Sequence, residues 1–240
     1  MFEDALTYPT RSDDWTGKLL LGGLLGMFAW LIVPLFALTG YYVRTLRATI
    51  AGDDELPTFD DWGDLVVEGI KAAAIVLAFL LVPFLLMAII VGVGGEPGPG
   101  GGFVLLLVTL AFYYAVPAGL AAFAERGRLA DGFDLDRLTT LLTSSTYAFG
   151  WLMALAVSLV IGVITLVGAT MATLAASIIG IIPILGWIVA FFIGVAVALG
   201  VQCANFYAAL AVMRIYGRVY VKVLDVAPAE SSPARSTGPS

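Results

Sequence analysis

The sequence has 240 residues, of which 60% are hydrophobic and 12% are charged, with 18 acidic residues against 12 basic ones. A charged share about half that of ordinary soluble domains excludes a typical globular enzyme. Histidine is absent and only one cysteine is present, so the chain lacks the commonest metal ligand and general base and cannot form an internal disulfide. We predict no catalytic residue, no metal and no cofactor.

Long runs without Asp, Glu, Lys or Arg dominate the chain. The longest extends from Leu138 to Met213, and the others are Leu19 to Val43, Ala72 to Gly95 and Pro97 to Ala124. As a helix, each run is long enough to cross a hydrocarbon core of about 30 Å. The runs are continuous rather than alternating, which excludes barrel strands. The sequence therefore predicts an all-α, polytopic transmembrane helical bundle in one domain, residues 1–225.

About five spans are predicted, at residues 19–42, 70–94, 103–124, 147–168 and 187–213. The longest run must turn back between Gly168 and Gly186, either as a broken, partly embedded connection or as a simple hairpin with a proline kink. The first run either crosses once or bends at Pro34 and returns as a re-entrant element. The segment 226–240 consists of Pro, Ser and other small or polar residues and is predicted to be a disordered tail.

Basic residues indicate the orientation. They flank or occupy the two longer loops and follow the last span, whereas the connection from Glu96 to Gly102 has none. The positive-inside rule therefore places both loops and the C-terminus in the cytoplasm of a multi-pass cell-membrane protein. Five crossings would leave the N-terminal tail outside.

The two predicted cytoplasmic loops resemble each other, with Phe59-Asp60-Asp61-Trp62 in the first and Phe133-Asp134 in the second. Each is expected to contain an amphipathic interfacial segment, and the first is predicted as a surface helix over Thr58–Gly69 capped by Thr58. A duplicated unit and a chance likeness of membrane-interface chemistry both explain the match. The acids of the first loop are read as solvated surface, with a cation site as the alternative.

Few polar residues lie inside the predicted spans. On the last span Ala190, Gly194 and Ala198 recur every four residues, a spacing that favours close helix packing, and Gln202 and Asn205 follow on the same face. These amides either bond across a packed bundle or line a polar path with Ser158, Thr165 or Thr109. No ionisable residue lies at the centre of a span, which argues against proton pumps and voltage sensors.

Several short motifs are similar to a known family. They are Tyr8-Pro9 with Asp13-Asp14-Trp15, Gly40-Tyr-Tyr-Val-Arg44, Leu56-Pro-Thr-Phe-Asp-Asp-Trp62 and Arg214-Ile-Tyr-Gly217. Over roughly residues 3–222 the chain resembles the archaeal membrane family catalogued as domain of unknown function 4013. This resemblance implies an integral membrane protein, often from salt-loving archaea, with no assigned activity. The acidic excess would suit a high-salt cytoplasm.

Two functions are compatible with these features. The first is a non-enzymatic membrane component that assists or organises partners. The alternative is a carrier or channel for a neutral or small apolar solute. The predicted partners are the lipid bilayer and either another membrane protein or further copies of the chain, and nucleic acid is not among them.

Overall fold

The computed structural model describes residues 2–94, 98–180, 182 and 184–226. In chain order its helices are α1 (Phe2–Thr7), η1 (Tyr8–Thr10), α2 (Trp15–Met27), α3 (Ile32–Ala51), α4 (Trp62–Gly94), α5 (Pro99–Arg126), η2 (Leu129–Phe133), α6 (Leu135–Leu142), α7 (Ser145–Ile179) and α8 (Leu185–Leu224). No strand occurs in these described ranges, and the predicted all-α fold is confirmed. The predicted tail lies outside the described residues except for Val226.

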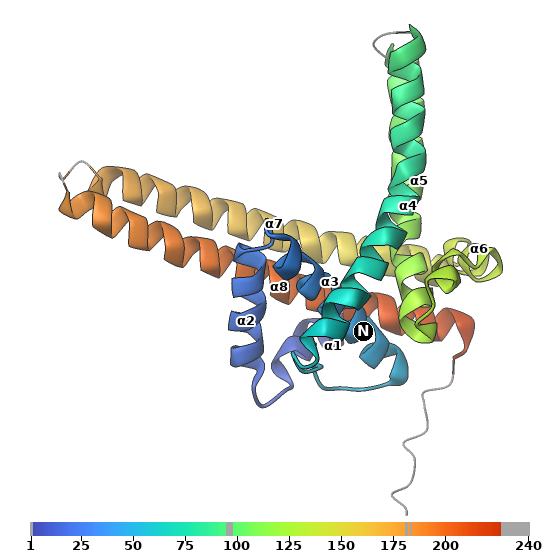
Figure 1. Ribbon diagram of the computed structural model, residues 1–240, viewed down its shortest axis with the longest axis horizontal. Helices are drawn as coiled ribbons and strands as arrows, with labels where there is room; N and C mark the ends of the chain where they lie inside the picture. The colour runs from blue at the N-terminus through green and yellow to red at the C-terminus, as the bar shows by residue number, and fades with distance from the viewer. Residues whose placement is uncertain (1, 95–97, 181, 183, 227–240) are drawn as a thin grey trace, which may run out of the picture.

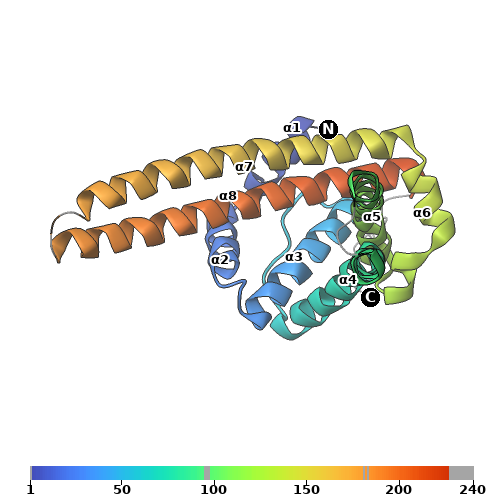
Figure 2. The same cartoon turned by 90° about the horizontal axis from the view of Figure 1, so that it is seen from above.

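Four helices, α4, α5, α7 and α8, are long and apolar enough to cross a membrane. They form two antiparallel hairpins, α4–α5 and α7–α8, which diverge from a common base (Figures 1 and 2). The 33 residues of α4 and the 35 of α7 give each helix a length of about 50 Å, against a hydrocarbon core of about 30 Å. Helices longer than the hydrocarbon core are accommodated in a bilayer by tilting.

The outer parts of both hairpins carry large exposed apolar side chains, such as Phe84, Leu106, Leu166 and Phe191. Within the described chain the only helix that covers each outer part is the other helix of its own hairpin. An apolar surface of this extent is stable in lipid and not in water. These four helices make the chain a multi-pass membrane protein.

The base consists of α1, η1, η2, α6, the adjoining ends of the other helices and the loops between them, and it holds every described Asp, Glu, Lys and Arg. One buried apolar cluster surrounds Ile75, Phe123 and Ile215, and a second surrounds Tyr41 and Leu65. The α3 and α4 backbones touch at Gly40 and Gly69, since a Cβ on either glycine would overlap a carbonyl oxygen of the other helix. The base is therefore a packed unit from which the hairpins extend.

The single helix predicted over 19–42 is wrong. The chain forms α2 and α3 with a break at residues 28–31, and Leu31 has an extended backbone. Pro34 lies in the first turn of α3, where its missing N–H costs no helical hydrogen bond. The alternative of a bent, returning element describes this segment better than a single crossing helix does, although the break precedes Pro34.

The separate surface helix predicted over Thr58–Gly69 is also wrong. Residues 58–61 are irregular, and one continuous helix runs from Trp62 to Gly94. The expected cap by Thr58 is absent because its hydroxyl binds the Asp60 carboxylate at 2.5 Å instead. In the second loop, by contrast, the amphipathic segment forms α6, and the Asp134 side chain accepts a hydrogen bond from the Arg137 N–H at its start.

The turn within the longest apolar run lies between Ile179 and Leu185, inside the predicted interval. Both helices that flank it are longer than the spans predicted at 147–168 and 187–213. Residues 181 and 183 are outside the described ranges, so the choice between an embedded break and a simple proline kink concerns a segment that is described only in part.

Candidate functional site

The loop motif Phe59-Asp60-Asp61-Trp62 packs within the base. The Phe59 ring stacks on Tyr41 with centroids 3.9 Å apart, and Arg44 Nη1 donates to the Asp60 carbonyl at 2.7 Å. Trp62 is 44% exposed at the start of α4. Asp61 has a positive φ of 49°, which the contacts around it hold in place. This geometry gives the four motif residues a role in closing the loop onto α3.

Gln202 on α8 forms a hydrogen bond with α2, the first of the two helices in the apolar run 19–43. Its Nε2 donates at 3.1 Å to the Gly26 carbonyl in the last turn of α2, which also accepts from the Ala29 N–H at 3.2 Å. Three glycines let α2 approach α8, because Gly22, Gly23 and Gly26 face Phe206, Cys203 and Gln202 respectively. Gln202 therefore has a structural partner across the helix interface.

The other predicted polar residues do not join Gln202. Asn205 is exposed and has no hydrogen bond to any residue that the structure describes. The hydroxyls of Ser158, Thr165 and Thr109 donate to backbone carbonyls of their own helices at 2.8 to 3.0 Å. The structure does not bring these side chains together into one polar path.

The small-residue face of α8 lines an open groove instead of a close helix contact. Gly194 is exposed, and a Cβ built on it meets no atom within 4 Å, so the tight packing predicted there is not formed within the chain. A groove of about 460 Å³ runs between α7 and α8, with Gly194, Ala198 and Gln202 on one wall. The opposite wall contains Ala169, Ala172, Thr173 and Ala176. Ala190 is half-buried and does not line it.

A buried arginine that the sequence analysis used only for orientation organises the base. The Arg214 side chain is fully buried, its Cζ lies 4.5 Å from the centroid of the Tyr8 ring, and its Nε lies 3.2 Å from Asp4 Oδ2. It also donates to the Asp53 carbonyl at 2.6 Å and pairs with Asp54. Its place in the closing motif Arg214-Ile-Tyr-Gly217 was the only signal in the sequence.

The charge of Asp4 fits this cluster. Partial burial by itself would raise the pKa of the Asp4 carboxyl, but hydrogen bonds from Arg11 and Arg214 hold it below its usual value. Because Asp4 belongs to α1 and Arg214 to α8, the N-terminal helix lies on the same side of the hairpins as the end of α8. The side of the membrane on which the N-terminal tail lies stays a prediction.

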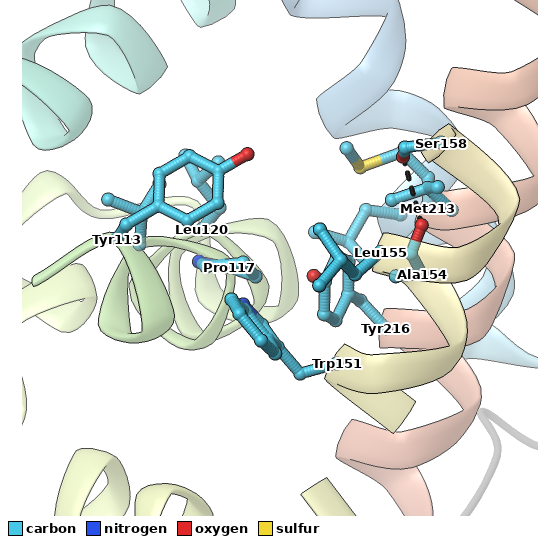
Figure 3. Close-up of a pocket in the computed structure, with 12 residues that line it drawn as sticks. Tyr113, Pro117, Leu120, Trp151, Ala154, Leu155, Ser158, Met213 and Tyr216 are labelled. Carbon is cyan, nitrogen blue, oxygen red and sulfur yellow. Dashed lines mark hydrogen bonds between the residues drawn. The ribbon is translucent and has the colours of Figure 1, made fainter. Parts of the chain in front are cut away.

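A second hollow lies where α5 meets the α7–α8 hairpin. This cavity of about 200 Å³ is lined mainly by apolar side chains from α5, α7 and α8, with the aromatic residues Tyr113, Trp151 and Tyr216 among them (Figure 3). No charged residue lines it. This cavity could not be predicted from the sequence because its lining residues come from four separate helices, α3, α5, α7 and α8. The aromatic residues near the ends of the apolar runs were the only signal.

The fold and these sites define a class, a helical membrane protein with two apolar hairpins on a charged base. The model of the family described as protein of unknown function (DUF4013) matches residues 25–170, and the chain belongs to this family. The match is narrower than the resemblance expected over residues 3–222, and it ends within α7, so Gln202 and Arg214 lie beyond it. No curated protein and no solved structure matches the chain.

Proposed function

We propose that the protein is a non-enzymatic component of the cell membrane that organises partner membrane proteins. The observation that carries this proposal is the groove between α7 and α8. Small residues on both walls permit close approach of another helix, and none of the described residues fills the space beside Gly194. The proposed occupant is a transmembrane helix of a partner protein.

The base is proposed to face the cytoplasm, with the C-terminus on that side. The basic residues of both loops and of the end of α8 lie there, and basic residues near span ends favour the cytoplasmic side. The position of α1 on the base supports an N-terminus on the same side and a count of four crossings. The excess of acids over bases supports an origin in a salt-loving archaeon.

The structure gives less support to a carrier or channel. A solute path for neutral molecules needs polar groups that remain free to bind the solute in turn. Here the Gln202 amide donates to Gly26, and the hydroxyls of Ser158 and Thr165 bond to their own helices. Each of these three side chains thus has a structural hydrogen bond.

Photo-crosslinking from the groove tests the partner role. A benzophenone side chain placed at Val197, which lines the groove, should yield a discrete adduct with one membrane protein in native membranes. The same group at Phe191, exposed on α8 but outside the groove, is the matched control and should label lipid. Adding Gly194→Leu should abolish the Val197 adduct, whereas Gly200→Leu, at another open position of α8, should leave it unchanged.

Lipid labelling alone from Val197 would contradict the partner role. A protein adduct containing two copies of this chain would identify the partner as a second copy. Proteoliposome swelling in glycerol or urea provides the complementary test, because the proposal predicts rates equal to those of protein-free vesicles. A protein-dependent rate that Gln202→Leu abolishes would instead favour the carrier or channel.

A further inference from the structure

The cavity between α5, α7 and α8 combines apolar walls with uncharged polar groups. It shares no residue with the small-residue groove, so an inference about it is independent of the partner role. Its lining includes Val116, Leu120 and Met213 together with the hydroxyls of Tyr113 and Tyr216 and the indole of Trp151. Figure 3 shows α5 on one side and α7 and α8 on the other.

Tyr216 has a hydroxyl without a hydrogen-bond partner among the described residues. The residue is 8% exposed and lines the cavity, yet its hydroxyl makes no hydrogen bond with the residues that the structure describes. Neighbouring tyrosines do have partners, since Tyr147 donates to the Tyr114 carbonyl at 2.8 Å and Tyr220 donates to Glu125 at 2.8 Å. A hydroxyl that has no partner on the wall of a cavity can donate a hydrogen bond to a molecule that enters the cavity.

Pro117 adds an acceptor to the same cavity. A proline inside a helix has no N–H to give to the carbonyl four residues earlier, which here belongs to Tyr113. Both Pro117 and Tyr113 line the cavity. The carbonyl of Tyr113 therefore lacks its usual donor within the helix, and a ligand hydroxyl, which both donates and accepts, matches this carbonyl and the Tyr216 hydroxyl.

The surroundings exclude a charged ligand and provide room for a hydrocarbon chain. No charged residue lines the cavity, and ionic groups of the base such as Arg137 and Glu125 are paired with each other. A neighbouring hollow of about 380 Å³ shares Trp151 with the cavity and has an almost wholly apolar lining, including Leu107, Leu110 and Leu152. A hydrocarbon chain attached to a polar head in the cavity would lie in this neighbouring hollow.

We infer that the cavity binds the uncharged, hydroxyl-bearing head of an amphipathic molecule whose hydrocarbon chain lies along α5 and α7. The head accepts from Tyr216 and donates to the Tyr113 carbonyl, and Trp151 separates head from chain. A neutral diglyceride lipid and a free long-chain alcohol both have this chemistry. Phospholipids with charged heads do not.

The test uses the purified full chain in phosphatidylcholine vesicles with a diazirine-bearing diacylglycerol as the probe. Light should attach the probe to the α7 segment 145–160, and unlabelled dioleoylglycerol should compete, whereas anionic phosphatidylglycerol should not. Competition by decanol in addition would show that a free alcohol is also accepted. Competition by decanol alone would identify the free alcohol as the ligand.

Two variants and a control locate the site. Tyr216→Phe keeps the ring and removes the donor, so labelling of 145–160 should require about fivefold more probe. Ser158→Leu fills the mouth of the cavity from an exposed position and should abolish that labelling. Tyr42→Phe, which removes a hydroxyl outside the cavity, is the matched control and should have no effect. Labelling that is unchanged in both Tyr216→Phe and Ser158→Leu, or equal competition by phosphatidylglycerol, would overturn the inference.

Discussion

Arg214 and Asp4 are separated by 210 residues in sequence, yet Arg214 Nε lies 3.2 Å from Asp4 Oδ2. This ion pair fixes the N-terminal helix to the last helix. The same guanidinium also binds the loop after α3 through the Asp53 carbonyl. Three segments that are distant in sequence are thus held by one buried cation, and both ends of the described chain lie on the base.

Removing this cation should loosen the base. Arg214→Ala deletes a fully buried side chain with its ion pairs and its stacking on Tyr8, and we expect a loss of about 2 to 4 kcal/mol in unfolding free energy. Arg218→Ala is the control, because that side chain is 40% exposed and pairs with the same carboxylates. Its loss should stay below about 1 kcal/mol. Thermal unfolding in detergent measures both, and equal shifts would contradict the assignment.

The Asp4 pairing should depend on pH. The pKa of Asp4 is lower in the folded chain than its ordinary value, so its contribution is complete above about pH 3.9 and is lost as the pH falls through the folded-state pKa. Wild type should exceed Asp4→Asn by about 1 to 3 kcal/mol at pH 6, and the gap should shrink at pH 3. A gap that is constant or widens on acidification would contradict this sign.

The crossing of α3 and α4 should not tolerate any side chain. A Cβ on Gly69 would overlap the Phe36 carbonyl oxygen, so Gly69→Ala should force the helices apart and cost about 1 to 3 kcal/mol. Gly63→Ala lies in the first turn of the same helix with no atom within 4 Å of the new Cβ, and it should be neutral or slightly stabilising. Equal melting temperatures for the two variants would show that the crossing is wider than described.

The divergence of the hairpins should be measurable in a bilayer. Spin labels at Val104 on α5 and Leu174 on α7 are on exposed apolar surface of different hairpins. Double electron–electron resonance should report a separation far larger than the 8–10 Å between packed helices. A label pair at Leu166 on α7 and Val195 on α8 provides the short-distance control. A short distance between Val104 and Leu174 would mean that the hairpins pack together.

Four of the long helices could be predicted from sequence because lipid demands uninterrupted apolar runs, and the runs 72–95, 97–124 and 138–213 supply them. The break between α2 and α3 could not, since it depends on contacts such as the bond from Gln202 to Gly26, 176 residues away. The predicted helix at Thr58 failed for a similar reason. The capping motif at Thr58 is a local signal. The stacking of Phe59 on Tyr41 and the hydrogen bond from Arg44 to the Asp60 carbonyl hold these residues in an irregular conformation instead of a helix.

The same distinction between local signals and contacts distant in sequence applies to the site residues. Gln202 was recognised because an amide in an apolar run is conspicuous, and its bond to a helix backbone matches the structural alternative considered from the sequence. Gly194 was expected in a close contact because spacing alone does not reveal which face meets a neighbour. Tyr216 could not be singled out from the sequence, because aromatic residues near span ends are common in membrane proteins. That its hydroxyl has no partner among the described residues can be seen only in the structure.

The central claim is that the chain crosses the membrane four times from one charged base, with the N-terminal segment on the same side as both loops. Single cysteines at Thr10, Gly100 and Ala130, each exposed, are introduced in a Cys203→Ala background and labelled by an impermeant reagent in sealed right-side-out vesicles. The account predicts that Gly100→Cys is labelled while Thr10→Cys and Ala130→Cys react only after the vesicles are opened. Labelling of Thr10→Cys together with Gly100→Cys would contradict it and restore five crossings.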